Sequence, residues 1–555
     1  MRRSVLFFML MIAVSLYGCG QQTSKTMLIE AESFDDRGGW VVDNQSMVQM
    51  GSPYLMAHGL GVPVRDASHV IRLSRDGVFR VWVRTRDWVK PWGKEGAPGR
   101  FEVRFNGIPL DTVFGTKSAD WRWQDGGTLE LKAGDNLITL HDLTGFNGRC
   151  DAICLTADLK QRLPEDLSAL NAFRERKSGA PKRAQEMGDY DLVVVGGGIA
   201  GCCAAISAAR LGCKVALIQN RPVLGGNNSS EVRVGLSGLI SQSPYPNLGN
   251  LLDEFGIVGH WNNWEAKQHP DTERSRQIAG ILARYPEKMI HNAGPAGNYE
   301  DEKKERLVRG EKNISLFLNM QVYEVEKKGN RIRSVTGKDI LTGEKYRFKA
   351  NLFADCTGDG NLGYLAGADY RMGRESRDET GESLAPEKVD RLVMGTSVQW
   401  YASDAGENTA FPECPWALLF DEHSCRPNLR GDWDWEAGMD RDQVEEIEYI
   451  RDYALRAVFG NWDFLKNRSE RKDAYANKKL EWVAYIGGKR ESRRLLGDVI
   501  LKGQDLLTGT LFDDASFTTT WDIDLHYPKP VEGMTEEPFL SFADSRKIQP
   551  FAVPY

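Results

Sequence analysis

Apolar and polar residues alternate along much of residues 27–158, and this period of two predicts a series of short β-strands. The alternation is clearest in GVFRVWVRTRD (77–87), RFEVRFNG (100–107) and GTLELKAGDNLITLHDL (127–143). Turn residues separate such runs about every 8 to 12 positions, as in all-β sandwiches. We therefore expect residues 27–158 to form an N-terminal all-β sandwich of the jelly-roll-like kind.

The pattern changes at residue 190. The stretch YDLVVVGGGIAGCCAAISAARLGCKVALIQN (190–220) has the pattern of a buried strand, a glycine turn, a helix and a second strand. Gly196, Gly198 and Gly201 have the GxGxxG spacing directly after the first strand. In such a unit the first glycine allows the tight turn, the second lets the backbone approach a pyrophosphate, and the third lets the helix pack closely. The sequence thus predicts an α/β Rossmann-type domain, with a glycine-rich turn in an unrelated α/β protein as the alternative.

The position that usually holds an acidic residue for the ribose is occupied by Gln219. An amide can still form a hydrogen bond with a ribose hydroxyl, although it carries no charge.

Residues 159–189, between the two regions, are charged and weakly helical and end in Gly and Pro. They predict a linker helix followed by a flexible tether.

Three further pieces of sequence favour a flavin. RPVLGGN (221–227) resembles the segment that wraps the FAD pyrophosphate in glutathione-reductase-type flavoproteins. NLFADCTGDG (351–360) resembles the flavoprotein strand that ends in an A-x-x-T-G-D-G turn. ISLFLNMQVYEV (314–325) alternates as a strand between them, with Val322 where such folds meet the adenine through the main chain.

The region from about 190 to 555 resembles a bacterial family of FAD-dependent oxidoreductases, often encoded beside glycan-degrading enzymes. RPVLGGNNSSEVRV (221–234), DCTGDGNLGYLAGA (355–368), GGKRESRRLLGD (487–498) and TTWDIDLH (519–526) carry this resemblance. It implies FAD as cofactor. The segments at about 251–309 and 381–520 are longer, more helical and rich in Trp, His and charged residues, and they predict an inserted α+β substrate region. The cofactor-binding residues that we expect are Gly196, Gly198, Ile199, Ala200, Gly201, Gln219, Asn220, Arg221, Gly225, Gly226, Val322, Thr357, Gly358 and Asp359.

Two clusters are candidates for the chemistry. Arg233 follows the pyrophosphate wrap and is placed to stabilise an anionic reduced flavin, with Glu231 to orient it. The alternative is an ion pair within the chain. Hydride removal from an alcohol needs a base for the hydroxyl proton, and histidine has a suitable ordinary pKa. His526 is our first choice, with Asp524 or Asp522 to orient it. A structural histidine at a domain seam is the alternative, and His260 and His291 are weaker candidates.

The ends of the β region, IEAE and DAICL, resemble galactose-binding-like carbohydrate-binding modules. In those modules the corresponding ends often hold a structural calcium ion, so Glu30, Glu32 and Asp151 are candidate ligands, with plain surface carboxylates as the alternative. Trp88 and Trp92 lie in a loop rich in Pro and Gly and are candidate sugar contacts. The alternative is that they lie in the core or dock the module onto the flavin domain.

Composition sets the outer limits. The 555 residues are 41% hydrophobic and 27% charged, which is ordinary for a soluble globular protein. The net charge of −7 gives no sign of a nucleic-acid-binding surface. No second GxGxxG follows a strand, so we expect no separate NAD(P) domain. Cys150 and Cys154, and Cys414 and Cys425, are close enough in sequence to pair, but no spacing requires it.

The N-terminus predicts export from the cytoplasm. Residues 1–18 have a basic start and an apolar run too short to span a bilayer, and LYGC (16–19) resembles a lipobox. We expect a lipoprotein signal peptide, lipidation of Cys19, and attachment to a membrane in the cell envelope, periplasmic or outer-membrane in a Gram-negative cell. An ordinary secretory signal peptide is the alternative.

At the other end, the chain stops at IQPFAVPY (548–555), where flavoproteins of this kind continue into a segment that closes over the flavin. We expect that closing segment to be missing by truncation. The sequence therefore leaves two candidate functions. One is a cell-envelope FAD-dependent oxidoreductase that oxidises a carbohydrate or related alcohol by hydride transfer. The other is a truncated, redox-inactive glycan-binding lipoprotein with a vestigial flavin fold.

Overall fold

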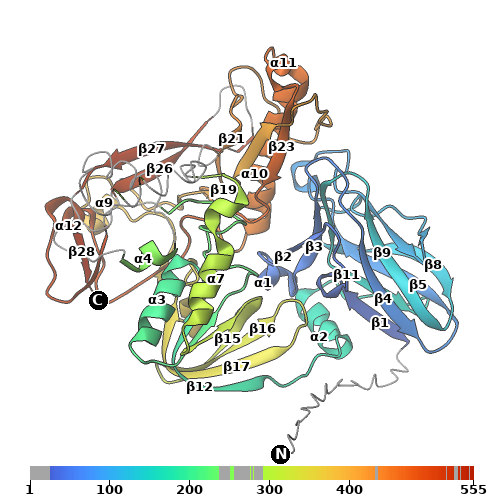
Figure 1. Cartoon of the computed structure of the whole chain (residues 1–555), viewed down its shortest axis with the longest axis horizontal. Helices are drawn as coiled ribbons and strands as arrows, with labels where there is room; N and C mark the ends of the chain where they lie inside the picture. The colour runs from blue at the N-terminus through green and yellow to red at the C-terminus, as the bar shows by residue number, and fades with distance from the viewer. Residues whose placement is uncertain are drawn as a thin grey trace, which may run out of the picture.

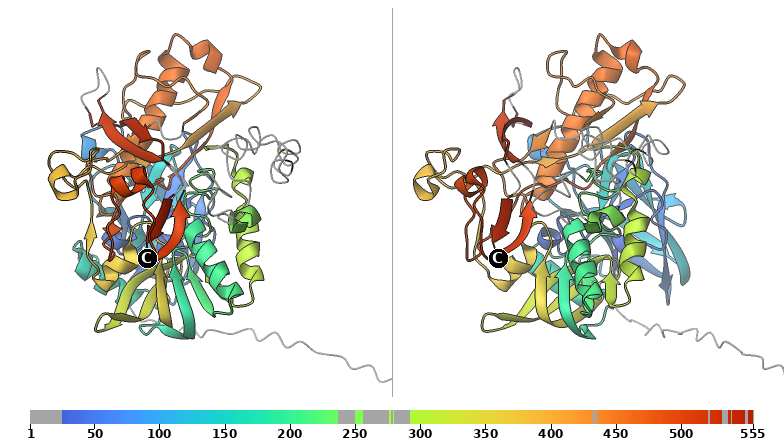
Figure 2. Two further views of the ribbon diagram at one scale, coloured as in Figure 1. Left: turned by 90° about the vertical axis from the view of Figure 1, so that its left-hand side faces the viewer. Right: turned by 60° about the vertical axis from the view of Figure 1, so that its left-hand side comes forward.

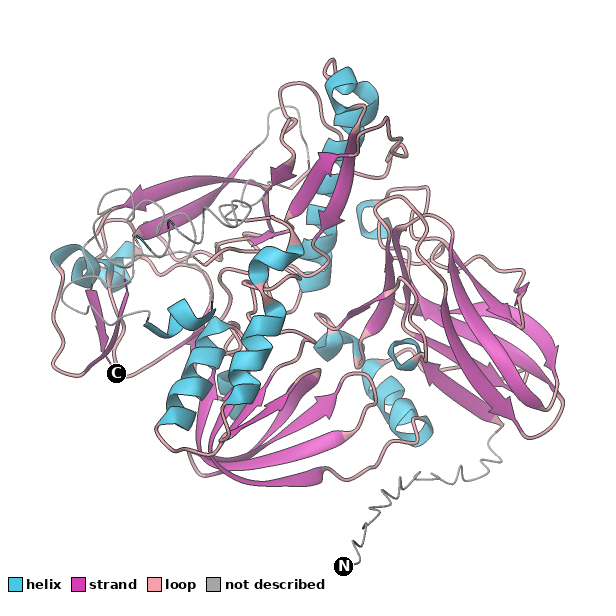
Figure 3. Cartoon of the chain, viewed as in Figure 1, coloured by secondary structure: helices cyan, strands magenta, loops and turns pink. Residues whose placement is uncertain are grey.

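A computed structural model of the chain describes residues 25–236, 250–255, 276, 279, 292–431, 435–519, 522–530, 536–537, 539–548 and 551–554. Figure 1 shows an all-β part, in blue, beside a larger part built around a second sheet. Figure 3 shows that the first part is almost entirely strands, whereas helices pack on the sheet of the second. Among the residues so described, no helix has both the length and the apolar character needed to cross a membrane.

The N-terminal part is an all-β sandwich, as the alternating pattern predicts. Its sheets are antiparallel, and Phe101, Val81 and Leu140 are fully buried between them. In β6, buried and more exposed side chains alternate because successive residues point to opposite faces, whereas β10 and β11 are buried along their whole length. The sheets are β1 (Thr26–Glu30), β11 (Ala152–Thr156), β5 (Gly77–Thr85) and β8 (Arg122–Leu131); β4 (Ala67–Leu73), β9 (Gly134–Asp142), β6 (Phe101–Phe105) and β7 (Ile108–Pro109); and β10 (Phe146–Cys150), β3 (Tyr54–His58) and β2 (Val41–Asp43).

Three short helical turns complete the sandwich: η1 (Ala31–Ser33), α1 (Met47–Met50) and η2 (Lys90–Trp92). The residue after α1 is Gly51, with φ +84°, and a Cβ there would lie 2.0 Å from Asn171 Oδ1. Only glycine therefore fits where α1 ends against the segment that follows the sandwich.

The predicted linker contains a helix, α2 (Leu167–Lys177), and this helix packs on the sandwich. The side chain of Asp166 caps it by accepting from the backbone N–H of Ala169 at 3.0 Å. Leu170 and Phe173 are buried against the sandwich residues Leu28, Trp123, Ala152 and Cys154. The predicted linker helix is thus present and fixed to the sandwich, because its apolar face is covered by one sheet.

The second part is built on a six-stranded mixed sheet of order β14-β13-β12-β17-β16-β15. The first four strands in this order are parallel, and β17, β16 and β15 form an antiparallel meander. Helices α3 and α7 cover one face with Ile206 and Val308 (Figure 1). The elements are β12 (Gln185–Val195), α3 (Ile199–Arg210), β13 (Val215–Ile218), α4 (Asn250–Phe255), η4 (Ala296–Tyr299), α7 (Asp301–Gly310), β14 (Ile314–Phe317), β15 (Met320–Lys328), β16 (Arg331–Asp339), β17 (Lys345–Asp355) and α8 (Asn361–Ala366).

The remaining residues form a third layer above the sheet, organised around the long helix α10 (Ile447–Asp463) (Figure 2). This helix is buried along almost its whole length. The other elements of this part are β18 (Tyr370–Arg371), α9 (Arg377–Thr380), β19 (Thr396–Ser397), β20 (Trp400–Asp404), β21 (Arg430–Gly431), β22 (Glu436–Ala437), η5 (Phe464–Arg468), α11 (Lys472–Tyr475), β23 (Lys478–Val483), β24 (Arg494–Leu495), α12 (Gly503–Thr508), β25 (Ala515–Thr519), β26 (Ile523–Lys529), β27 (Leu540–Arg546) and β28 (Phe551–Pro554).

The sandwich docks on α10 through buried charges. Arg149 of β10 forms ion pairs with Glu448 at 2.7 Å and with Asp452 at 2.6 Å, and Asp43 of β2 pairs with Arg451 at 2.7 Å. Burial alone would raise the pKa of Glu448, but Arg86, Arg149 and Arg451 lower it to about 2. Buried charges are tolerated only when they are paired in this way.

Aromatic side chains complete the same interface, and they correct one prediction. Trp88 is fully buried, and its ring lies 5.2 Å from that of Trp416, centroid to centroid. The ring of Trp92 lies 4.6 Å from that of Tyr449. The two tryptophans predicted as candidate sugar contacts therefore serve the alternative role, docking between the two parts, because their indole faces are covered by aromatic residues of the second part.

The four cysteines considered for disulfides are unpaired: Cys150, Cys154, Cys414 and Cys425 are all buried as free thiols. Burial raises the pKa of Cys154 to about 12, so this thiol stays protonated and unreactive near neutral pH. These side chains act as small core residues.

Candidate active site

A cavity of about 550 Å³ lies at the carboxyl ends of the parallel strands. Val195 at the end of β12, Ile218 at the end of β13 and Cys356 just after β17 all line it. This edge is where open α/β sheets bind their ligands. Every predicted cofactor residue except Gly201 lines this cavity: Gly196, Gly198, Ile199, Ala200, Gln219, Asn220, Arg221, Gly225, Gly226, Val322, Thr357, Gly358 and Asp359.

The three glycines of the turn differ in what surrounds them. Gly196 has φ +104°, and a Cβ there would lie 2.2 Å from the carbonyl oxygen of Cys356. A Cβ on Gly201 would lie 1.8 Å from the carbonyl oxygen of Gly196, so this glycine allows α3 to pack against the turn. A Cβ on Gly198 would meet no atom within 4 Å. Two glycines are thus required by the protein itself, whereas Gly198 leaves space on the cavity side.

Helix α3 begins at Ile199 with Gly198 as its N-cap residue. No side chain caps its first amides, and Cys202 is the first residue of the helix to donate to Gly198. The backbone N–H groups of a helix start carry partial positive charge and favour phosphate. This start and the space at Gly198 together form a cradle for an anionic group.

The segment after β13 closes over the glycine turn. The N–H of Gly225 donates to the carbonyl of Gly197 at 2.8 Å, and Gly198 and Gly225 form a parallel bridge. Gly226, with φ +61°, approaches Gly198 so closely that a Cβ would lie 3.2 Å from its Cα. Glycine is therefore favoured at position 226, where φ is positive and the backbone of Gly198 lies close.

The third side of the cavity is the turn after β17. Asp355 holds it by accepting from the Thr357 hydroxyl at 2.7 Å and from the N–H of Gly363 at 2.9 Å. Asp359 accepts from the Ser492 hydroxyl at 2.8 Å and pairs with Lys489. Both Asp359 and Lys489 line the cavity, so the turn brings a buried carboxylate and a cation to its wall.

The side chain of Gln219 braces the glycine turn. Its Oε1 accepts from the N–H of Gly197 at 2.9 Å, and its Nε2 donates to the carbonyl of Val223 at 3.1 Å. One N–H and one lone pair of the amide are left, so a ribose contact stays a prediction. An amide suits this position because the two backbone contacts require one donor and one acceptor, whereas a carboxylate would only accept.

Glu231 does not orient Arg233. Its carboxylate forms two hydrogen bonds with Arg221, at 2.6 and 2.9 Å, and accepts one from the Tyr485 hydroxyl at 3.1 Å. Arg233 instead stacks on Trp482, with its guanidinium carbon 3.8 Å from the ring centroid, and does not line the cavity. Burial lowers the pKa of Arg233 to about 10. The structure therefore supports the alternative to the predicted role, an ion pair within the chain. This pair joins Glu231 to Arg221.

His526 lies in a charged cluster beside the cavity. Its ring nitrogens are 2.7 Å from Glu436 and 3.2 Å from Asp524, and Arg490 pairs with both carboxylates. Burial opposes its protonation, but hydrogen bonds with Asp524 and Glu436 raise the pKa of His526 to about 9. A protonated imidazole has no lone pair for a substrate proton. The geometry therefore favours a role in orienting Glu436 and Asp524, which pair with the cavity-lining Arg490, over the predicted role as base.

The other histidine candidates, His260 and His291, lie outside the described residues, as do Cys19 and most of the predicted region 251–309. Asp522, the second predicted orienter, accepts from the N–H of Ile548 at 3.1 Å instead.

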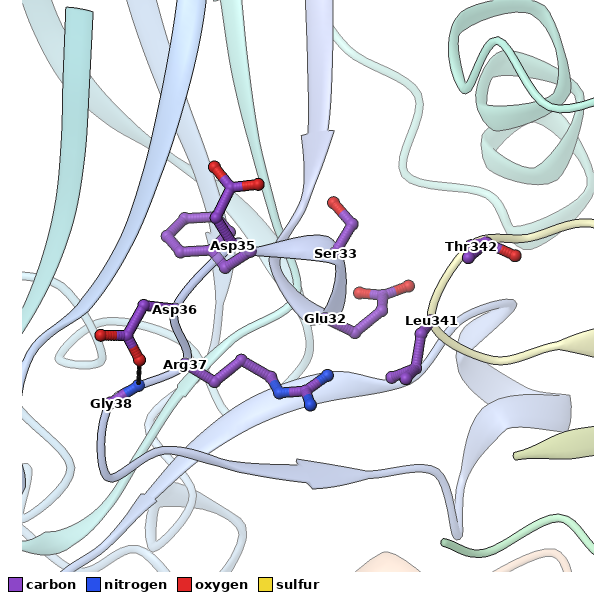
Figure 4. Close-up of a pocket in the computed structure, with 9 residues that line it drawn as sticks. Glu32, Ser33, Asp35, Asp36, Arg37, Gly38, Leu341 and Thr342 are labelled. Atoms are coloured by element: carbon purple, nitrogen blue, oxygen red, sulfur yellow. Dashed lines mark hydrogen bonds between the residues drawn. The ribbon is translucent and has the colours of Figure 1, made fainter. Parts of the chain in front are cut away.

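The predicted calcium ligands lie at the junction of the two parts, where η1 faces the turn between β16 and β17 (Figure 4). Figure 4 shows Glu32 pointing toward Leu341 across a shallow hollow. Asp151 is neutralised by Arg84 and Arg174, each at 2.6 Å. Burial, Glu30 and Asp151 together raise the pKa of Glu32. In the part of the chain that the structure describes, no three or more His, Cys, Asp or Glu side chains form a group that could hold a metal ion.

Sequence reasoning missed one wall of the cavity. Asn44, Gln45, Met47, Val48 and Gln49 line it, and all five belong to the sandwich. No motif marks them, because their position depends on how the two parts dock. Lys489 and Arg490 belong to the motif GGKRESRRLLGD (487–498), but the motif did not predict a cofactor role for them.

Comparison with known proteins gives a family. A family of proteins described as FAD dependent oxidoreductase matches residues 191–555. Among curated relatives, a tRNA uridine 5-carboxymethylaminomethyl modification enzyme, MnmG 1, of Fusobacterium nucleatum is 29% identical over 38% of this chain and 32% of its own length. A soluble pyridine nucleotide transhydrogenase of Stutzerimonas stutzeri is 27% identical over 22% of this chain and 26% of its own length. The chain thus spans a third or less of these relatives.

Two solved structures resemble parts of this chain, each with a TM-score of 0.25 or less. A family 35 carbohydrate binding module from Clostridium thermocellum is 16% identical and covers 24% of this chain and 98% of its own, with a TM-score of 0.20. The p-nitrophenol 4-monooxygenase PnpA from Pseudomonas putida is 16% identical and covers 40% of this chain and 49% of its own, with a TM-score of 0.25.

Proposed function

Because this chain belongs to the FAD dependent oxidoreductase family, we propose that it oxidises a carbohydrate or related alcohol by hydride transfer to FAD. The observation that carries the proposal is the cavity at the carboxyl edge of the sheet, where the glycine turn, the 221–227 wrap and the 357–359 turn meet. The strand, turn, helix and strand of residues 185–218 act in it as a Rossmann-type dinucleotide-binding unit.

The residues present fit FAD. The space at Gly198 and the start of α3 suit the pyrophosphate, and Gly225 and Gly226 cover it from the other side. Val322 and the turn at Thr357, Gly358 and Asp359 also line the cavity, and in this proposal the adenine lies beside Val322. Bound FAD would accept the hydride with its two electrons, and the hydroxyl proton would pass to solvent water, because His526 is already protonated near neutral pH.

The cations of the cavity have a defined task in this proposal. Lys489 and Arg490 line the wall, held by Asp359 and by the cluster of Glu436, Asp524 and His526. A fixed positive charge stabilises negative charge that develops during hydride transfer. We assign this task to Arg490 and Lys489, because Arg233 faces Trp482 instead of the cavity.

The carbohydrate substrate rests on the likeness of the IEAE and DAICL ends of the sandwich to carbohydrate-binding modules. Calcium is not part of the proposal, because Asp151 is already neutralised by two arginines. Attachment to the cell envelope rests on residues 1–19. Incorporation of labelled fatty acid into the full chain, but not into a Cys19→Ser variant, tests the attachment.

Reconstitution tests the cofactor and the reaction in order. Purified protein is mixed with FAD, desalted and examined for the visible absorbance of bound flavin. The loaded protein is then mixed without oxygen with a panel of sugars and sugar alcohols. We expect bound flavin and bleaching of its absorbance by at least one alcohol, with dithionite as the control for complete reduction.

Two results would contradict the proposal at different points. Bound flavin that dithionite bleaches but no alcohol bleaches would refute the alcohol substrate. Protein that holds no flavin after reconstitution would refute the cofactor and favour a redox-inactive, glycan-binding function, which a glycan array can then examine.

A further inference from the structure

One wall of the cavity comes from the sandwich. Residues 44–49, from the end of β2 through α1, line it together with the 219–221 segment and with Gln321 and Val322 of β15. Figure 1 shows β2 and α1 on the side of the sandwich that faces the mixed sheet. A module about 150 residues upstream of the glycine turn in sequence thus reaches the predicted cofactor site.

The 44–49 segment is clamped to two other walls of the cavity. On one side, Nδ2 of Asn44 donates to the carbonyl of Asn220 at 2.6 Å, and Arg221 donates to Oδ1 of Asn44. On the other side, Oε1 of Gln45 accepts from the N–H of Gly487 at 2.7 Å, and its Nε2 donates to the carbonyl of Tyr485 at 2.9 Å. The segment therefore joins the strand end after β13 to the segment before Lys489.

Buried charges hold this arrangement in place. Asp43, directly before the segment, pairs with Arg451 of α10 at 2.7 Å, and both side chains are about 1% exposed. Burial alone would raise the pKa of Asp43, but Arg451 and hydrogen bonds lower it to about 2, so the pair stays charged near neutral pH. An ion pair so deeply buried favours one docking geometry, because any other would leave unpaired charges.

The side chains of the segment suit a nucleoside. Val48 lines the cavity and is 65% exposed, so an apolar surface is uncovered there. Gln49 lines the cavity beside it, and within the described residues its Oε1 is a buried acceptor with no hydrogen-bond partner. An apolar face beside an unsatisfied acceptor matches a flat heterocycle that carries an N–H donor.

We propose, building on FAD as the cofactor, that the 44–49 segment of the sandwich forms part of the FAD site and closes its adenosine end. Val48 covers an apolar face of the nucleoside, and Gln49 accepts a hydrogen bond from it. Asn44 and Gln45 are positioning residues that fix the segment to the rest of the site. The sandwich is then a structural component of cofactor binding in addition to any role in substrate recruitment.

The test places a charge on the segment without disturbing the core. Val48→Asp puts a carboxylate beside an anionic ligand, and Val62→Asp makes the same change at a valine of the sandwich that is also 65% exposed but does not line the cavity. Binding of FAD and of ADP to the full chain is measured by calorimetry. We expect both ligands to bind Val48→Asp roughly tenfold more weakly and to bind Val62→Asp as they bind the wild type.

Each of the other possible results of these binding measurements answers a different question. Wild-type affinity for FAD in Val48→Asp would overturn the inference and leave the proposed function intact. Weaker FAD binding with unchanged ADP binding would overturn the adenosine assignment, since the segment would then face the flavin half. Equal weakening in Val62→Asp would overturn the inference as well, because the effect would not depend on the cavity. Absence of FAD binding in the wild type would refute the proposed function itself.

Discussion

Single residues at the cavity show which features serve the protein and which are left for a ligand. Gly196 and Gly201 are required by backbone contacts, whereas the space beside Gly198 is filled by no part of the described chain. Gln219 and Glu231 are polar residues that line the cavity, yet their hydrogen bonds go mainly to the protein. Gly198 is therefore the residue at which a small change tests the ligand most directly.

We expect Gly198→Ala to weaken FAD binding at least tenfold with no loss of folding. The added methyl group meets no protein atom, and φ at this residue is −63°, which alanine adopts freely. It would, however, occupy the space that a pyrophosphate needs. Calorimetric titration with FAD measures the change. Gly310→Ala, at a glycine of α7 that also has nothing within 4 Å of its Cβ, is the control, and equal affinities in both variants would contradict the prediction.

We expect the stabilising effect of His526 to depend on pH. Its pKa is raised from 6.5 to about 9 by Asp524 and Glu436, so the folded state favours the protonated ring. This stabilisation is complete below pH 6.5 and is lost as the pH rises through 9. Melting temperatures of the wild type and His526→Gln over this range measure it. The difference between the two proteins should shrink as the pH rises, and a difference that grows would contradict the prediction.

The elements differ in how far the sequence predicts them. The strand, glycine turn, helix and strand of residues 185–218 follow from local patterns, since each depends on its own residues and on turn chemistry. The partners of Arg149, Trp88 and Glu231 do not follow, because ion pairs and aromatic contacts between distant segments depend on docking. Trp88 and Trp92 looked exposed because they lie in a loop with Pro and Gly, yet α10 and its neighbours cover them.

At the element level, we expect Arg149→Met to lower the free energy of unfolding by about 3 to 5 kcal/mol. The substitution leaves the buried carboxylates of Asp452 and Glu448 with one cation fewer. Arg65→Met removes an exposed ion pair with Asp36 and should cost about 0 to 1 kcal/mol. Urea denaturation of the three proteins gives the values. Equal losses in the two variants would show that the α10 interface contributes no more than a surface pair.

The whole molecule behaves as two docked parts joined by one exposed connection. Residues 178–184 lie between α2 and β12, with no helix or strand of their own, and Lys182 and Arg183 are exposed. Ion pairs and aromatic contacts hold the sandwich to α10 independently of this connection. The sandwich should therefore stay in place when the connection is cut.

We expect limited trypsin digestion to cut after Lys182 or Arg183 without separating the fragments. Gel electrophoresis under denaturing conditions should show two pieces, and size-exclusion chromatography should show one particle of unchanged size. Addition of salt screens exposed charges more than buried ones, so moderate salt should leave the particle intact. Fragments that elute separately would show that the covalent connection, and not the interface, holds the two parts together.

The cavity is lined by residues from Asn44 to Glu491, so its walls come from parts of the chain that are far apart in sequence. During synthesis the wall from the sandwich emerges long before the residues that complete the opposite side. The site is therefore complete only after contacts of large sequence separation have formed, and we expect full binding of the cofactor only then. Retention of the cofactor is then expected to report that both parts of the protein have assembled.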